Sequence, residues 1–180
     1  CRLILSKTEL AYNGNVQTPT LSVVNPNGIQ LTLGTHYSAT YSAGRKNVGT
    51  YNVTVKMKGN YTGTQTITYA IKPTIKKSET LLLGNTTNIE AKSNAKITYK
   101  SSDPSVATVS TAGVITAVKA GTATITVTSD KVSQDITIKV NTPSIKLNCT
   151  DTTVGIYSYL KLYATTNPSG ATVKWTSSNT

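Results

Sequence analysis

Short stretches of alternating apolar and polar residues follow one another along this chain. Successive side chains of a β-strand point to opposite faces, so each stretch predicts a strand with one buried face. Before residue 73 the alternation predicts strands at Leu3 to Leu5, Leu21 and Val23, Leu31 and Leu33, Tyr37 to Tyr41, Tyr51 to Met57, and Ile67 to Ile71. No window of ten or more residues keeps an i, i+3, i+4 apolar pattern. The chain is therefore predicted to be all-β.

Turn-forming residues separate the predicted strands. They occur at Asn13-Gly14, residues 25–28, Gly34-Thr35, residues 44–49 and Gly59-Asn60. The number of strands before residue 73 is that of a β-sandwich.

A second series of strands begins after a predicted linker at residues 72–77. Pro73 restricts its own backbone and that of Lys72, so we expect a semi-rigid linker and modules that lie end to end. The second series comprises Leu81 and Leu83, Ile89 and Ala91, Ile97 and Tyr99, Val106 and Val109, Val114 with Thr116 and Val118, Ala123 to Val127, and Ile136 to Val140. Pro143 interrupts it, and a third series follows.

The predicted organisation is therefore two complete antiparallel sandwiches, residues 1–73 and 75–141, and a third, truncated unit at 143–180. Trp175, Leu160, Leu162 and Val173 of that third unit are expected to be more exposed than Tyr99, Ile89 and Ile97. The sequence shows no signal peptide and no long apolar run, so we expect export and anchoring signals to lie elsewhere in a longer protein.

Composition supports strands, because Thr and Ser supply more than a quarter of the chain and Phe is absent. The formal net charge is +11, which attracts polyanions at low salt. The basic residues are scattered and form no dense run, which argues against specific nucleic-acid recognition. They indicate either solvated strand faces or a polyanion-binding stripe. Cys1 and Cys149 fall in different units, so no disulfide between them is expected.

The middle unit carries two ordered motifs. Residues 98–109, TYKSSDPSVATV, resemble the W-x-S-S-x-x-x-V-A-x-V signature of bacterial Ig-like domains of group 2. Residues 113–127, GVITAVKAGTATITV, resemble the same family's G-x-V-T-A-x-x-A-G-T-A-x-I-T-V. The third unit repeats the opening of the pattern with Gly155, Leu160, Leu162 and residues 173–179. The resemblance implies tandem immunoglobulin-like β-sandwiches with a buried aromatic at Tyr99 and at Trp175.

The first unit resembles another Ig-like repeat, found in surface proteins of Gram-positive bacteria. The resemblance rests on Tyr12, Gly14, Pro19, Gly34, Thr35, Tyr37, Tyr41, residues 47–51 and the segment GNYTGT at 59–64. His36 and Lys58 depart from the usual pattern, which adds to the basic bias. Both families imply an extracellular location, on a bacterial cell surface or secreted.

The leading hypothesis is a non-catalytic spacer or stalk in an adhesin-like protein, and the chain is not expected to be an enzyme. The alternative is a carbohydrate- or polyanion-binding accessory module of a secreted enzyme. Outer sheet faces rich in threonine would favour the spacer. An exposed row of aromatics or a basic groove would favour the accessory module.

No catalytic, cofactor or metal-binding residues are assigned. His36 has no partner at metal or triad spacing, and Asp130, Asp135 and Asp151 are isolated. Glu9 and Glu90 are candidates for the carboxylate beside a Lys–Asn isopeptide bond.

Tyr61, Tyr157, Tyr159 and Tyr163 offer a ligand platform if they face outwards, and Trp175 either stacks on sugar or packs in a core. The expected partners are host or cell-wall glycans or acidic polymers. We expect no specific nucleic acid, no membrane insertion in this fragment and a monomer.

Overall fold

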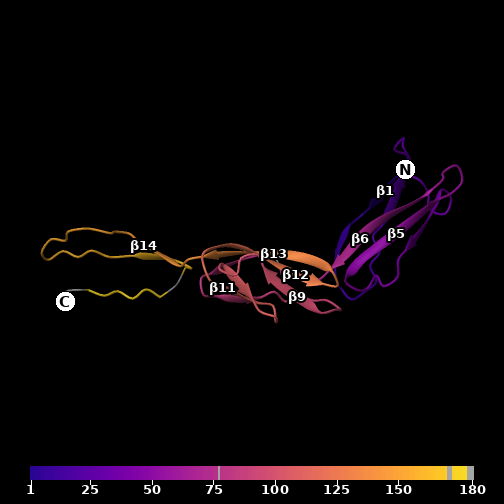
Figure 1. The fold of residues 1–180 in the computed structure, drawn as a ribbon. Coiled ribbons are helices and arrows are strands. Elements are labelled where there is room, and N and C mark those ends of the chain that lie inside the picture. Colours follow the sequence, from indigo (N-terminus) through magenta and orange to yellow (C-terminus); the bar gives the residue numbers. More distant parts are fainter. Residues whose placement is uncertain (77, 170–171, 178–180) are drawn as a thin grey trace.

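The computed structural model describes residues 1–76, 78–169 and 172–177. Lys77 of the predicted linker, and Ser178 and Asn179 of the third repeat, lie outside the described residues. Within the described part the chain forms strands and turns and no helix. It folds as tandem immunoglobulin-like β-sandwiches, which lie end to end (Figure 1).

The N-terminal sandwich consists of two facing sheets. One pairs β1 (Arg2–Leu5) with β3 (Leu21–Val24). The other has the order β2-β6-β5-β4, built from β2 (Glu9–Ala11), β6 (Thr64–Lys72), β5 (Gly49–Met57) and β4 (Tyr37–Tyr41). β2 runs parallel to β6, and the other neighbours are antiparallel. β6 then leads straight towards the second sandwich (Figure 1).

The central sandwich repeats this plan with more strands. Its larger sheet has the order β7-β13-β12-β9, built from β7 (Glu79–Leu82), β13 (Val132–Asn141), β12 (Gly121–Ser129) and β9 (Ile97–Ser101). Its smaller sheet has the order β10-β11-β8, built from β10 (Ala107–Val109), β11 (Val114–Ala117) and β8 (Thr86–Asn88). β7 is parallel to β13, as β2 is to β6.

Each sandwich has its own apolar core, formed by alternate strand residues. In β5, Tyr51, Val53, Val55 and Met57 are buried, while the residues between them face outwards. In the central sandwich the buried set includes Ile89, Ile115, Ile125, Val127, Ile136 and Ile138, each at most 1% exposed. Burying each such side chain contributes about 1.5–3 kcal/mol.

The C-terminal segment, from residue 143 onwards, adds one pair of strands on the far side of the central sandwich (Figure 1). β14 (Ser144–Leu147) pairs antiparallel with β15 (Ala164–Asn167). Trp175 is 48% exposed, Leu160 43% and Leu162 46%, against 0% for Ile89. The expected difference in exposure is confirmed for these three against Ile89. Val173 is half-buried, as are Tyr99 and Ile97.

Two predicted details of the N-terminal sandwich were wrong. Leu31 and Leu33 form no strand: Leu33 makes only an isolated bridge with Tyr37, and Leu31 only donates its N–H to Val23 O at 2.8 Å. The N–H of Gly34 donates to Tyr37 O and winds the segment into a turn. Leu31 is buried and Leu33 exposed. The parallel strand β2 was also missed. This strand has only three residues, and a single large apolar side chain, Leu10, is too short a pattern to show alternation.

The inward face of β11 was also predicted wrongly. The sequence favoured Val114, Thr116 and Val118, but Ile115 and Ala117 are buried and Val118 is 46% exposed. Both alternating sets contain apolar residues here, so the pairing of β11 with β8 and β10 decides the face. A shift of one residue exchanges the two faces of a strand.

Gly113 should be essential for the central sandwich. Its φ is +78°, and an added Cβ would lie 2.8 Å from the Tyr99 hydroxyl and 2.9 Å from Cζ. We expect Gly113→Ala to cost about 1–2 kcal/mol for the backbone conformation, and about 1–3 kcal/mol more for displacing the ring. Gly84→Ala is the matched control, because its φ is +84° with no atom within 4 Å. Denaturant unfolding measures both, and equal losses would contradict the contact with Tyr99.

Deleting residues 143–180 should leave the unfolding of the rest almost unchanged. Both core clusters are built from residues before 141, so the deletion removes no core side chain. Solubility should rise, because exposed side chains such as Ile156 and Tyr157 are removed. Thermal unfolding and sedimentation of the shortened and full chains test this. A large drop in melting temperature would mean that the central core extends past Pro143.

Candidate functional site: the groove beside Tyr99

The motif residues 101–107 build a turn between β9 and β10. Ser101 Oγ donates to Ala107 O at 2.7 Å, and Asp103 N–H donates to Ser101 Oγ at 3.2 Å. Asp103 Oδ1 accepts both the backbone N–H of Ser105, at 3.0 Å, and its hydroxyl, at 2.7 Å. These hydrogen bonds, led by that of the Ser105 side chain, lower the pKa of Asp103. The motif thus fixes the path of the chain between the two sheets.

Tyr99 lies at the open edge of the central sandwich rather than deep inside it. The sequence predicted a buried side chain, but the ring is half-buried and packs against the core from outside. The reason is topological: β9 is the edge strand of its sheet, bonded on one side only, by β12. The ring covers Gly113, which directly precedes β11 of the smaller sheet, and the missing Cβ of this glycine leaves the necessary room.

A groove opens beside this ring, between the edges of the two sheets. It has a volume of ≈ 410 Å³ and is lined by residues 96–99, at the start of β9, and residues 109–111, at the end of β10. Ile97, Tyr99 and Val109 give it an apolar floor, and Lys96 adds a positive charge. The arrangement suits a small ligand with an apolar face and an anionic group.

The hydroxyl of Tyr99 differs from those of the tyrosines packed in the N-terminal core. Burial raises the pKa of Tyr99, as it does for Tyr41, Tyr51 and Tyr69. The other three hydroxyls donate to backbone carbonyls: Tyr41 to Pro19 at 3.1 Å, Tyr51 to Gly44 at 2.7 Å and Asn47 at 2.9 Å, and Tyr69 to Gln17 at 2.9 Å. Among the described residues, Tyr99 has no such acceptor. Its hydroxyl lies over Gly113.

The outer faces of the larger sheets carry mainly threonine. The threonines that are exposed or half-buried on these strands include Thr50 and Thr54 of β5, Thr64, Thr66 and Thr68 of β6, and Thr122, Thr124, Thr126 and Thr128 of β12. Lys56, Lys100, Asp135 and Lys139 lie among them. No aromatic residue occupies an outward position of β5, β6, β12 or β13. These faces offer no stacking platform.

The four tyrosines proposed as a platform do not come together. Tyr61 is half-buried in the N-terminal sandwich, edge-on to His36 at 5.7 Å between ring centroids. Tyr157 and Tyr159 are fully exposed in the C-terminal segment, beyond the central sandwich, and Tyr163 is 56% exposed. Trp175 is 48% exposed there too, so the expected core position for it is wrong.

The other candidate residues have structural partners or stand apart. His36 Nδ1 accepts the backbone N–H of Thr32 at 2.9 Å, which closes the turn before β4. In the described part of the chain, no three His, Cys, Asp or Glu side chains gather to bind a metal ion. Cys1 is exposed, Cys149 is half-buried, and both are free thiols. No helix among the described residues is long and apolar enough to cross a membrane.

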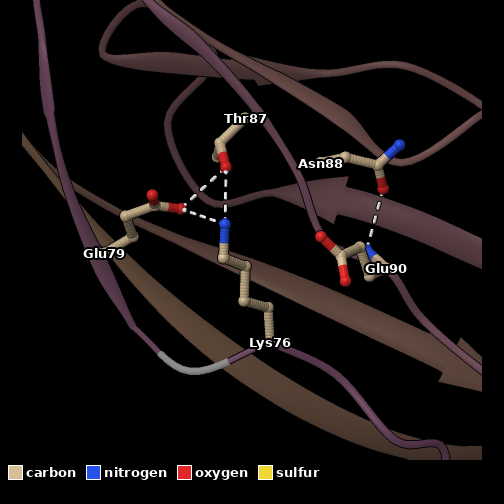
Figure 2. Close-up of polar contacts among 5 residues, drawn as sticks. All are labelled: Lys76, Glu79, Thr87, Asn88 and Glu90. Carbon is tan, nitrogen blue, oxygen red and sulfur yellow. Dashed lines mark hydrogen bonds and ion pairs between the residues drawn. The ribbon is translucent and has the colours of Figure 1, made fainter.

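The isopeptide candidates do not form the required group. Glu9 pairs with Lys72 Nζ at 2.6 Å on the surface. Figure 2 shows the Lys76 ammonium turned towards Glu79 and Thr87, whereas the Asn88 amide accepts the backbone N–H of Glu90 at 2.8 Å. The lysine and the asparagine therefore point to different partners.

Comparison with known proteins places the motifs in a family. Residues 64–140 match the model of the bacterial Ig-like domain (group 2). The central sandwich is a bacterial Ig-like domain of group 2. The matched range begins in β6, which pairs within the N-terminal sandwich. The preceding repeat and the C-terminal segment lie outside most of this match.

One curated relative is the kappa-carrageenase of Pseudoalteromonas carrageenovora, 45% identical over 74 residues. The match covers 40% of this chain and 19% of that enzyme's length. Among solved structures, domains 4 and 5 of the S-layer protein SbsC are 18% identical, with a TM-score of 0.30, over 78% of this chain and 98% of that one. The C-terminal fragment of intimin, solved with the intimin-binding domain of its translocated receptor, is 18% identical, with a TM-score of 0.36, over 82% and 66% of the two chains.

The lowered pKa of Asp103 predicts a loss of stability in acid. The folded pKa lies below its ordinary value near 3.8, so the carboxylate stabilises the Ig-like domain above the unfolded pKa. This contribution is lost as the pH falls through the folded pKa. Asp103→Asn keeps a hydrogen-bond acceptor but removes the charge. We therefore expect this variant to be less stable than the parent chain at pH 6, and the difference in stability to become smaller as the pH falls to 3.

Denaturant unfolding at the two pH values measures this difference. Asp135→Asn is the matched control, because Asp135 lies on the outer face of β13, outside the turn. A pH-independent effect of Asp103→Asn would contradict a role for the charge.

Proposed function

We propose that this chain is a non-catalytic spacer of a bacterial cell-surface or secreted protein. In this role it holds a distal binding region away from the surface to which the protein is attached. The segments 1–73, 75–141 and 143–180 are then successive modules, monomeric and outside the cell. The observation that carries the proposal is the pair of end-to-end sandwiches whose outer faces are rich in threonine.

The sheets serve such a role for physical reasons. Threonine is β-branched, so it favours the strand conformation, and its hydroxyl remains solvated. Cross-strand pairs add support, as between Thr54 and Thr66, whose Oγ1 atoms lie 3.5 Å apart. The faces therefore stabilise strands without presenting an apolar patch that would invite association.

A second candidate function is that of an accessory module in a secreted enzyme, with an acidic polysaccharide as partner. The groove beside Tyr99 favours it, because it combines an aromatic residue with Lys96. The net charge of +11 and the partial match to a carrageenase point in the same direction. In this case the chain binds the substrate and the catalytic groups lie in another part of the protein.

Binding of the full chain to an array of neutral, carboxylated and sulfated glycans separates the two functions. A spacer should give no signal above that of a protein of equal charge, and any weak signal should vanish at about 0.5 M salt, where exposed charges are screened. Specific binding that survives salt would contradict the spacer.

Two substitutions then locate any such binding. Tyr99→Phe and Lys96→Gln change the groove without removing a core ring, and Lys56→Gln on the N-terminal sandwich is the charge-matched control. Loss of binding in the first two but not in the control would assign the ligand to the groove.

A further inference from the structure

The connection between the two sandwiches is bonded on both sides of Pro73. Tyr12, which follows β2, donates its N–H to Lys72 O at 2.8 Å and accepts the Thr74 hydroxyl at its own carbonyl at 2.6 Å. Pro73 between them is buried and has a restricted φ. The backbone can therefore rotate here only if these hydrogen bonds break.

Thr74 is also bonded to the central sandwich. Its N–H donates to Lys92 O at 3.0 Å, and Lys92 N–H returns the bond to Thr74 O at 2.8 Å. Ser93, which follows Lys92, forms a hydrogen bond of 2.7 Å between its hydroxyl and that of Ser129. Ser129 is only 1% exposed. The loop at residues 92–94 is thus fixed to the connection and to the end of β12.

This fixed loop reaches across to the N-terminal sandwich. Asn94 Oδ1 accepts the backbone N–H of Val48 at 2.7 Å, although 46 residues separate the two. Val48 precedes β5 and is only 1% exposed, yet it is not a member of the N-terminal core cluster. The contact is a second attachment between the sandwiches, independent of the covalent connection.

The β12–β13 turn faces the same end of the N-terminal sandwich. Burial raises the pKa of the Tyr51 hydroxyl, and the negative charge of Asp130 in that turn raises it further. A groove of ≈ 190 Å³ also spans the junction, lined by residues 9–11 and Lys72 from one side and Gln134 from the other. Both observations place the ends of the two sandwiches against each other.

We infer that the N-terminal and central sandwiches form one rigid strut whose angle is fixed by the contacts Thr74–Tyr12, Thr74–Lys92 and Asn94–Val48. The connection through Thr74 alone would allow one sandwich to rotate relative to the other. The hydrogen bond between Asn94 and Val48 opposes this rotation. The inference goes beyond a spacer role, since it states that the spacer keeps a fixed direction as well as a length. It does not depend on whether the groove beside Tyr99 binds a ligand.

Distances between spin labels on the two sandwiches test this in the full chain. The native thiols are first removed by Cys1→Ser and Cys149→Ser, and labels are attached at Asn52→Cys and Thr137→Cys on outer faces of β5 and β13. A rigid strut should give one narrow distance distribution. A broad or multiple distribution in this otherwise unaltered chain would overturn the inference.

The joint between the two sandwiches, at residues 72–74 and 92–94, should become mobile when the side-chain hydrogen bonds of Thr74 and Asn94 are removed. The double variant Thr74→Val and Asn94→Ala should widen the distribution by about twofold, because relative motion is the default for small interfaces between domains. Thr68→Val with Asn60→Ala is the matched control at exposed positions away from the joint, and it should leave the width unchanged. An unchanged width in a folded double variant, checked by circular dichroism, would show that these contacts do not fix the angle. If the double variant unfolds, Thr74→Val alone is measured under the same criteria.

Discussion

The burial of alternate residues along two long hairpins is the constraint on which the whole chain depends. β5 pairs with β6, and β12 with β13, over eight and nine residue pairs. Their inward side chains, such as Val53, Ile71, Ile125 and Ile138, are fully buried. Both thiols are free, so these cores carry most of the stability without a disulfide. The shorter strands are added at the hairpin edges, in the same order in both sandwiches.

The same alternation creates the surface of the molecule. In β12 the buried residues Ala123, Ile125 and Val127 are each followed by a threonine on the outer face. The first half of β6 likewise exposes Thr64, Thr66 and Thr68. A strand with one buried face leaves the other free to vary, provided that it keeps a strand conformation and remains solvated. The threonine-rich faces are compatible with the proposed spacer role, because they remain solvated without a bound partner. Their lack of aromatic residues separates them from the groove, where Tyr99 and Lys96 lie together.

Sequence reasoning succeeded where one alternating set is apolar and the other polar. The buried faces of β5, β12 and β13 could be predicted for this reason. It failed at β11, where Val114 and Ile115 are both apolar and only the pairing with neighbouring strands selects the inner face. The small strand β2 also escaped notice, because its parallel pairing with β6 joins residues about 60 positions apart.

The joint was predictable in part. Pro73 indicated a stiff, short connection, but nothing local to Asn94 indicates that it reaches Val48. A hydrogen bond across 46 residues depends on where two folded modules place their loops. Such a contact becomes visible only in the folded chain.

Tyr99 shows how a folding motif and a candidate site arise from one position. The family signature places an aromatic residue on β9, and the absence of a Cβ at Gly113 allows its ring to close the edge of the sandwich. Because β9 is an edge strand, the ring covers the core with one part and borders the groove with another. Its hydroxyl has no backbone acceptor among the described residues, unlike those of Tyr41, Tyr51 and Tyr69. The core requires the ring but not the hydroxyl. The packing of the central core therefore places no demand on the hydroxyl, although it depends on the ring and on Gly113.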